Sequence, residues 1–195
     1  GKSGRDKLIR AIQRGHVSPT GRLHAIWIIA AAQSQEAIKA LFELAQSEHS
    51  VPVQIQIIRA IADLTDPILV QGNLKATRGN TTICQRLGEL PVERDPRLLR
   101  EVIIALGRLN WIDAPHWLSL HINSQPDTAI THATAWTFRQ ANNWPYVFTF
   151  WDDPLSPLRT AALNAAAEQT IPVVVDALLE RCMNRNQYAE MLVRV

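Results

Sequence analysis

The residues that most often hold metals or do acid–base chemistry are spread thinly along this chain. Cys84 and Cys182 are far apart in sequence, and His116 and His121, five positions apart, would point to different sides of a helix. There is no paired-cysteine ligand set, no glycine-rich phosphate loop and no Gly-x-Ser-x-Gly motif. We therefore expect no metal site, no cofactor and no catalytic residues. The six histidines are His16, His24, His49, His116, His121 and His132.

A second set of polar residues suits binding rather than catalysis. Its members fall on the polar positions of the proline-led helices described below, where the concave surface of a helical array would lie. They are Arg59 and Asp63, Glu101 and Arg108, His132 and Arg139, and Asn164 and Glu168. Members of a pair share a helix face. Because their signs are mixed, they suit a polar protein or peptide better than a phosphate backbone, which needs a consistently basic groove.

Aromatic residues crowd the last third of the chain. Large aromatic side chains between stacked helices usually pack the core, and that interpretation covers most of them. The alternative is that Trp144 or Tyr146 is partly exposed beside Asp152 and Asp153 and anchors a partner. The sequence leaves both possibilities open.

Composition indicates an ordinary folded protein of 195 residues, with 47% hydrophobic and 19% charged residues. No run of about 18 apolar residues predicts a transmembrane helix. The net charge of +2 is uneven, because residues 1–22 carry six basic residues against Asp6 alone. Lys7, Arg10 and Arg14 share one stripe of a predicted first helix, which is either a solvated face or a patch for an anionic partner.

The segment from Pro52 to Leu64 shows the element on which the chain is built. Ile55, Ile58 and Ile61 follow the spacing of one apolar helix face, and Pro52 fits the first turn, where a missing N–H costs nothing. From Leu23 to Ala32, by contrast, only His24 interrupts the apolar run. That run predicts a helix covered on almost every side, which belongs to the core rather than to a site.

Comparable proline-led segments begin at five prolines, Pro19, Pro52, Pro96, Pro126 and Pro157, in steps of 33, 44, 30 and 31 residues. Each step has room for a shorter helix before the proline, and such a period with two helices per unit is typical of an α-solenoid. Asp66-Pro67, Asp95-Pro96 and Asp153-Pro154 each predict an aspartate cap followed by a first-turn proline.

The long step contains an insertion around residues 66–90. It predicts a helical segment from Asp66, a break at 77–80 and a further helix from Thr81 to Leu90. An insertion in a solenoid maps to one face, where binding often resides, although surface insertions are also tolerated at little thermodynamic cost.

These features resemble the HEAT-repeat family. The resemblance rests on the proline before the second helix, on an early arginine (Arg22, Arg100, Arg159) and on small residues at helix crossings (Ala25, Ala60, Ala105, Ala162, Ala165). It implies an all-α fold, a right-handed α-α superhelix of the HEAT or armadillo type with five to six helix pairs. We expect one such domain over residues 1–195, including a last helix over 186–195, as a fragment of a longer chain.

A narrower likeness concerns residues 21–27, Gly-Arg-Leu-His-Ala-Ile-Trp. They resemble the HEAT region of large bacterial multidomain proteins described as membrane-bound dehydrogenases, which join a β-propeller, such a region and a haem-binding c-type domain. The Cys-x-x-Cys-His motif of that last domain is absent here, so no haem function is implied. The compartment stays open between the bacterial cytoplasm and export within a larger protein.

Three functional hypotheses follow. The first is a non-catalytic HEAT module that holds a protein partner or braces neighbouring domains of a larger chain. The alternative is a DNA-binding repair protein, since HEAT-like alkyl-base glycosylases use a concave cleft with Trp, Asp and Arg residues; the acidic balance after residue 22 argues against nucleic acid. The third is a helper module in an oxidoreductase.

Overall fold

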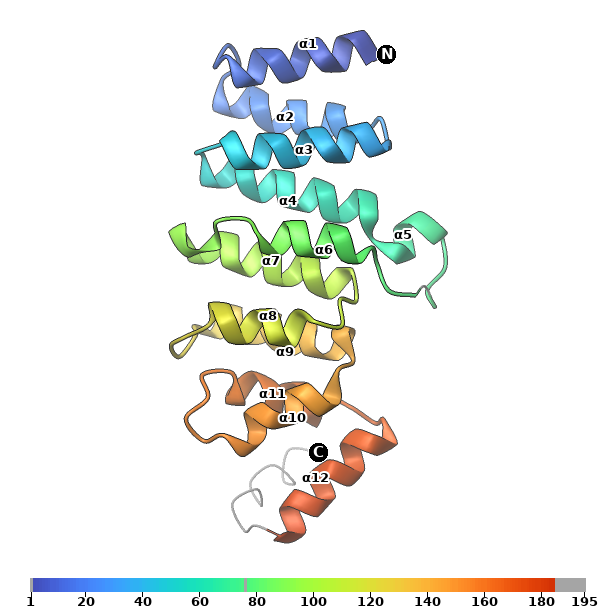
Figure 1. The fold of residues 1–195 in the computed structure, drawn as a ribbon, viewed down its shortest axis with the longest axis vertical. Helices are drawn as coiled ribbons and strands as arrows, with labels where there is room; N and C mark the ends of the chain where they lie inside the picture. The colour runs from blue at the N-terminus through green and yellow to red at the C-terminus, as the bar shows by residue number, and fades with distance from the viewer. Residues whose placement is uncertain (1, 76, 185–195) are drawn as a thin grey trace. The chain divides into compact units, whose positions relative to one another are not determined.

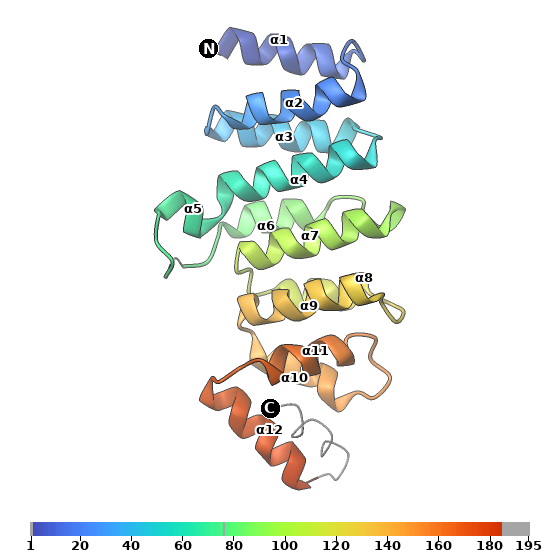
Figure 2. The ribbon, with the colours of Figure 1, turned by 180° about the vertical axis from the view of Figure 1, so that it is seen from behind.

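The computed structural model describes residues 2–75 and 77–184, and over these residues the chain is all-helical, with no strand (Figures 1 and 2). The predicted all-α class is therefore confirmed. The chain divides into two compact units, Gly1–Trp111 (unit 1) and Ile112–Val195 (unit 2), which are described one at a time. The helix expected over 186–195 lies outside the described residues.

Unit 1 is built from two layers of helices. Helices α3 and α6 lie on the side facing the viewer of Figure 1, and α2, α4 and α7 form the layer in front in Figure 2. Within that second layer α4 packs against both α2 and α7. The elements are α1 (Lys2–Gln13), α2 (Pro19–Ala30), α3 (Gln35–Ser47), α4 (Val51–Thr65), α5 (Pro67–Gln71), α6 (Thr81–Gly88), the 3-10 helix η1 (Val92–Arg94) and α7 (Pro96–Arg108).

Several helices of unit 1 begin at a polar cap, as the sequence predicts for Asp95-Pro96 and Asp66-Pro67. The hydroxyl of Ser18 accepts a hydrogen bond from the amide of Gly21 at the start of α2, and Ser34 accepts one from Ala37 at the start of α3. Asp95 likewise accepts from the amide of Arg97 at the start of α7. Each cap satisfies an amide that has no partner inside its helix, which stabilises the helix by about 1 kcal/mol.

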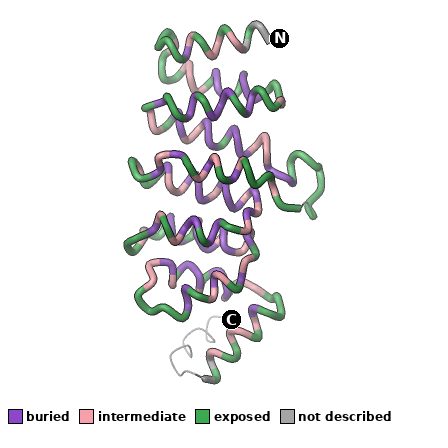
Figure 3. The backbone as a smooth tube through the Cα atoms, viewed as in Figure 1, coloured by how far each residue is buried: buried purple, intermediate pink, exposed green. Residues whose placement is uncertain are grey.

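The core of unit 1 lies between the two layers, along the buried positions of Figure 3. Ile57, Ile58 and Ile61 of α4 are buried, as the apolar spacing predicts. Ala60 of α4 and Ala105 of α7 are also buried, and their small side chains allow neighbouring helices to approach closely. The sequence thus places its largest apolar side chains between the layers and its smallest where helices cross.

Unit 2 is also built from packed helices. Its elements are α8 (Ala114–His121), α9 (Thr128–Ala141), α10 (Trp144–Asp152), α11 (Arg159–Ala167) and α12 (Pro172–Asn184). Helices α9 and α11 pack together, and α8 and α10 contact them from the other side. Ala161, Ala162, Ala165 and Ala166 of α11 are fully buried, so this helix packs almost backbone to backbone.

One predicted start signal in unit 2 is wrong. Asp153 accepts a hydrogen bond from the amide of Leu155, but no helix begins there, and α11 starts at Arg159. The reason is Pro157, whose ring disfavours helical backbone in the residue before it and whose nitrogen cannot donate. The pair Asp153-Pro154 therefore makes a turn rather than a capped helix.

The aromatic residues of unit 2 pack its core. Trp144 and Trp151 of α10 are buried, and the ring of Phe138 in α9 stacks on Phe150 with centroids 5.6 Å apart. The core-packing interpretation of these aromatics is therefore correct. No helix over the described part of the chain is long and apolar enough to cross a membrane.

Candidate partner-binding groove

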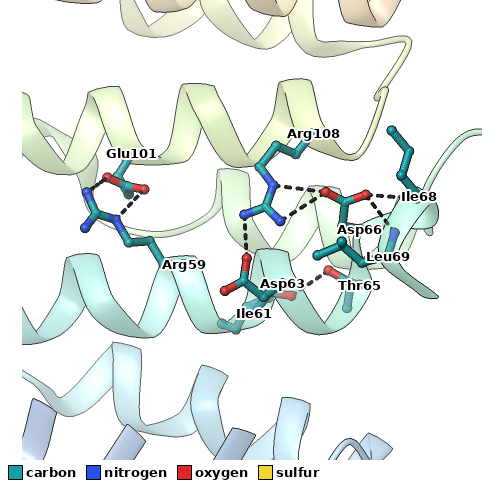
Figure 4. A network of polar contacts seen from close by, with 9 residues as sticks. All are labelled: Arg59, Ile61, Asp63, Thr65, Asp66, Ile68, Leu69, Glu101 and Arg108. Carbon is teal, nitrogen blue, oxygen red and sulfur yellow. Dashed lines mark hydrogen bonds and ion pairs between the residues drawn. The ribbon is translucent and has the colours of Figure 1, made fainter. Parts of the chain in front are cut away.

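The polar residues assigned to a binding surface pair with one another across neighbouring helices. In unit 1, Arg59 of α4 donates two hydrogen bonds to Glu101 of α7, Nε to Oε1 and Nη2 to Oε2, both at 2.9 Å (Figure 4). Glu101 is buried, whereas about half of the Arg59 side chain is exposed. The hydrogen bonds from Arg59 to Glu101 raise the pKa of the Arg59 guanidinium.

A second network joins the ends of the same two helices. Arg108 of α7 contacts Asp63 of α4 through Nη1 at 2.7 Å. Its Nε donates to Oδ2 of Asp66 at 3.0 Å, and its Nη2 lies 3.0 Å from the same oxygen (Figure 4). Arg59 with Glu101 and Asp66 with Arg108 are both 42 residues apart, so the two contacts hold one register between α4 and α7.

Unit 2 contains a comparable pair. Arg139 of α9 lies 2.9 Å from Oε2 of Glu168, just after α11. His132 and Asn164 are exposed on the same two helices. Six of the eight residues predicted to bind a partner thus contact each other, and each arginine among them already contacts a carboxylate. The sequence shows opposite charges on successive proline-led helices, but their offsets from the prolines differ, so it does not show which of them pair.

The proposed aromatic anchor is only partly supported by burial. Trp144 is 2% exposed, so the hypothesis of an exposed Trp144 is wrong; the start of α10 turns its ring into the core. Tyr146 is half-buried, and its hydroxyl lies 2.9 Å from Nδ1 of His116. Asp152 pairs with Arg181 at 2.9 Å.

The surface with the clearest capacity to bind is a groove in unit 1, which includes Asp63 of the predicted binding surface and Leu69 and Val70 of the predicted insertion. It has a volume of about 810 Å³ and lies at the end of α2, the end of α4 and along α5. Two polar hollows elsewhere in unit 1 are smaller, about 530 and 330 Å³. We call it the α5 groove. Its lining residues are Trp27, Ala30, Ala31, Gln33, Ser34, Gln35, Ile38, Asp63, Leu64, Leu69 and Val70.

Helix α2 supplies one wall, contrary to the expectation that it is covered on almost every side. Ile26 and Ile29 are buried, but Trp27 is 44% exposed and Ile28 is 62% exposed. Helices α1, α3 and α4 contact α2, and its remaining side faces solvent. An unbroken apolar run therefore exceeds what the core can bury, and the surplus side chains line the surface.

Helix α5 supplies the opposite wall, and the ion-pair network holds it in place. Oδ1 of Asp66 accepts hydrogen bonds from the amides of Ile68 and Leu69, while Oδ2 accepts from Arg108. One carboxylate thus caps α5 and ties it to α7. Leu69 and Val70 remain 59% and 65% exposed in the groove.

The segment after α5 is anchored again at Gly79. Its amide donates to the carbonyl oxygen of Leu109 at 2.8 Å. A Cβ on Gly79 would lie 2.7 Å from Cδ2 of Leu109 and 2.9 Å from its carbonyl oxygen, closer than such atoms approach. The glycine is therefore required by close backbone approach, which explains the break that the sequence predicts at 77–80.

The predicted chemistry-bearing side chains do not gather at one place. No group of three or more His, Cys, Asp or Glu residues that could hold a metal occurs among the residues that the structure describes. Cys84 is buried, and the side chain of Cys182 lies outside the described part. The ring of His121 stacks on Trp117, and its Nδ1 donates to the carbonyl oxygen of Trp117, 2.8 Å away.

Comparison of the chain with protein-family models, curated proteins and solved structures finds no match. The HEAT resemblance therefore remains a prediction from residues and spacing. The α5 groove, together with the paired charges of α4 and α7 beside it, is the candidate site.

Proposed function

We propose that this chain is a non-catalytic protein-binding module of the HEAT-repeat type, which holds a partner protein or a neighbouring domain in the α5 groove. The observation that carries the proposal is the exposure of Trp27, Leu69 and Val70, which all line one groove. Exposed apolar side chains that gather in one hollow typically mark an interaction site, whereas scattered ones do not.

The composition of the groove supports a protein partner. Its walls are apolar and include a tryptophan, the residue type most enriched at the energetic centres of protein interfaces. Its rim carries uncharged polar side chains at Ser34 and Gln35 and the carboxylate of Asp63. An apolar centre inside a polar rim is the usual arrangement of a protein interface.

The DNA-binding alternative gains no support from the layer beside the groove. Arg59 and Arg108 each contact a carboxylate. Arg139 of unit 2 also contacts one. Phosphate binding needs guanidinium groups that are not already compensated, so these arginines suit a structural role.

The test is a selection of short random peptides, displayed on phage, with the full chain as bait. Selected peptides are expected to bind the wild-type chain and to lose at least tenfold in affinity with the double variant Trp27→Ala and Leu69→Ser, as truncation of an interface centre does. The matched control is Ile28→Ser with Leu74→Ser, since both side chains are exposed but neither lines the groove. Failure to enrich any peptide, or equal affinity for both double variants, would refute the proposal.

A further inference from the structure

The charges around the α5 groove are unbalanced. Among its lining residues Asp63 is ionisable, and no lysine or arginine belongs to the described lining. The side chain of Asp63 is 39% exposed, so its carboxylate is accessible from the groove.

The arginine nearest to this carboxylate is already shared. Arg108 contacts both Asp63 and Asp66, so two carboxylates face one guanidinium. Most of the Arg108 donors are directed at Asp66, through Nε and Nη2, and Asp63 receives Nη1 alone. The network therefore keeps one negative charge in excess, at the end where it borders the groove.

The C-terminal ends of two helices add further negative charge to the groove. Helices α2 and α4 both end at the groove, with Ala30 and Leu64 among its lining residues, and a helix C-terminus carries partial negative charge. One helix N-terminus, that of α3, also reaches the groove, and the hydroxyl of Ser34 caps it. The α5 N-terminus is capped by the carboxylate of Asp66.

Trp27 offers a second favourable contact for a cation. Its indole is 44% exposed and lines the same groove as Asp63. A lysine or arginine can lay its apolar stem along Leu69 and Val70 while its charged head lies near an aromatic face or a carboxylate. Apolar walls, an exposed indole and excess negative charge thus favour one kind of side chain.

We infer that the occupant of the α5 groove is a protein segment that places a lysine or arginine next to apolar side chains. This inference rests on the proposed function and specifies the chemistry of the partner. An acidic or uncharged apolar segment would leave the excess negative charge at Asp63 without a partner. The negative charge of the groove therefore disfavours such a segment.

The experiment uses three phage libraries of short random peptides that differ in one fixed central residue: arginine, glutamine or glutamate. Groove-dependent binders, defined by loss of binding to Trp27→Ala with Leu69→Ser, are expected from the arginine library. Their affinity is then compared for Gln35→Lys and Gln35→Glu, because Gln35 is exposed on the rim and either substitution leaves the core untouched. We expect Gln35→Lys to weaken binding and Gln35→Glu to strengthen it, each about threefold to tenfold, and added salt to reduce both effects.

The outcomes separate the two claims. Groove-dependent peptides that come equally from all three libraries, or that bind Gln35→Lys more tightly than Gln35→Glu, would overturn the inference and leave the proposed function standing. Peptides from any library that bind the Trp27→Ala, Leu69→Ser variant unchanged, or no enrichment at all, would remove the proposed function and the inference with it. Circular dichroism of each variant confirms that it is folded before binding is measured.

Discussion

The Arg59–Glu101 contact between α4 and α7 allows a quantitative test of how unit 1 is held together. Substituting Arg59→Met keeps much of the apolar stem but leaves the buried Glu101 carboxylate without its two donors. An unpaired charge in a closed interior costs about 3–5 kcal/mol, but the Arg59 side chain is 46% exposed and water can replace part of it. We therefore expect a loss of about 1.5–2.5 kcal/mol in the free energy of unfolding.

The assay is a double-mutant cycle of Arg59→Met, Glu101→Gln and the double variant, with urea unfolding followed by circular dichroism. The expected coupling energy is about 1–2 kcal/mol. Arg97→Met is the matched control, because Arg97 makes the same two-point contact with Asp95, at 3.0 and 2.8 Å, but within one exposed helix start. That control is expected to shift the unfolding midpoint much less than Arg59→Met does, because both Arg97 and Asp95 lie at the surface. A coupling energy within error of zero, or a control that matches Arg59→Met, would refute the argument that burial of Glu101 sets the cost.

Three further predictions follow from the same unit. Gly79→Ala should destabilise by about 1–3 kcal/mol, because its Cβ would overlap Leu109, and thermal unfolding of the purified variant measures this. Asp66→Ala should lower the protection of the α5 amides against hydrogen exchange by about tenfold, by removing the cap, and unchanged protection would contradict the assignment. The hydrogen bonds from the side chain and the backbone amide of Arg97 lower the pKa of Asp95, so its stabilising contribution is present above the ordinary pKa of aspartate and is lost as pH falls through the lowered value. NMR titration should show that shift, and Arg97→Gln should reduce it without abolishing it, because the backbone amide of residue 97 still donates.

Local patterns predicted the helices well because the signals are short-range. Pro52 with the isoleucine spacing after it, and Asp95 as a cap, act within one or two turns, and α4 and α7 begin where these signals indicate. Asp153-Pro154 is a short-range signal too, but it starts no helix, because Pro157 follows three residues later and α11 begins only at Arg159. Competing local signals must be weighed together rather than one at a time.

The candidate site was harder to predict because it depends on which helix faces stay uncovered. The apolar run around Trp27 indicates burial in sequence, yet burial requires a neighbour on every side, and α2 has none beside Trp27 and Ile28. Arg59 and Glu101 were predicted to lie on a polar binding surface, but Glu101 is buried and the two side chains bind each other. Pairing between helices depends on their relative register, which no single helix encodes.

The contacts of Arg59 with Glu101 and of Arg108 with Asp66 hold α4 on α7 independently of the segment that follows Asp66. The chain leaves the packed helices at Asp66 and is anchored to them again at Gly79, so the stretch between these two points contributes little to the docking of α4 on α7. Its length and sequence can therefore vary without disturbing the scaffold, much as an antibody loop varies on a constant framework. The same stretch includes α5, the wall that carries Leu69 and Val70. Replacing it is a direct route to altered binding specificity on an unaltered scaffold.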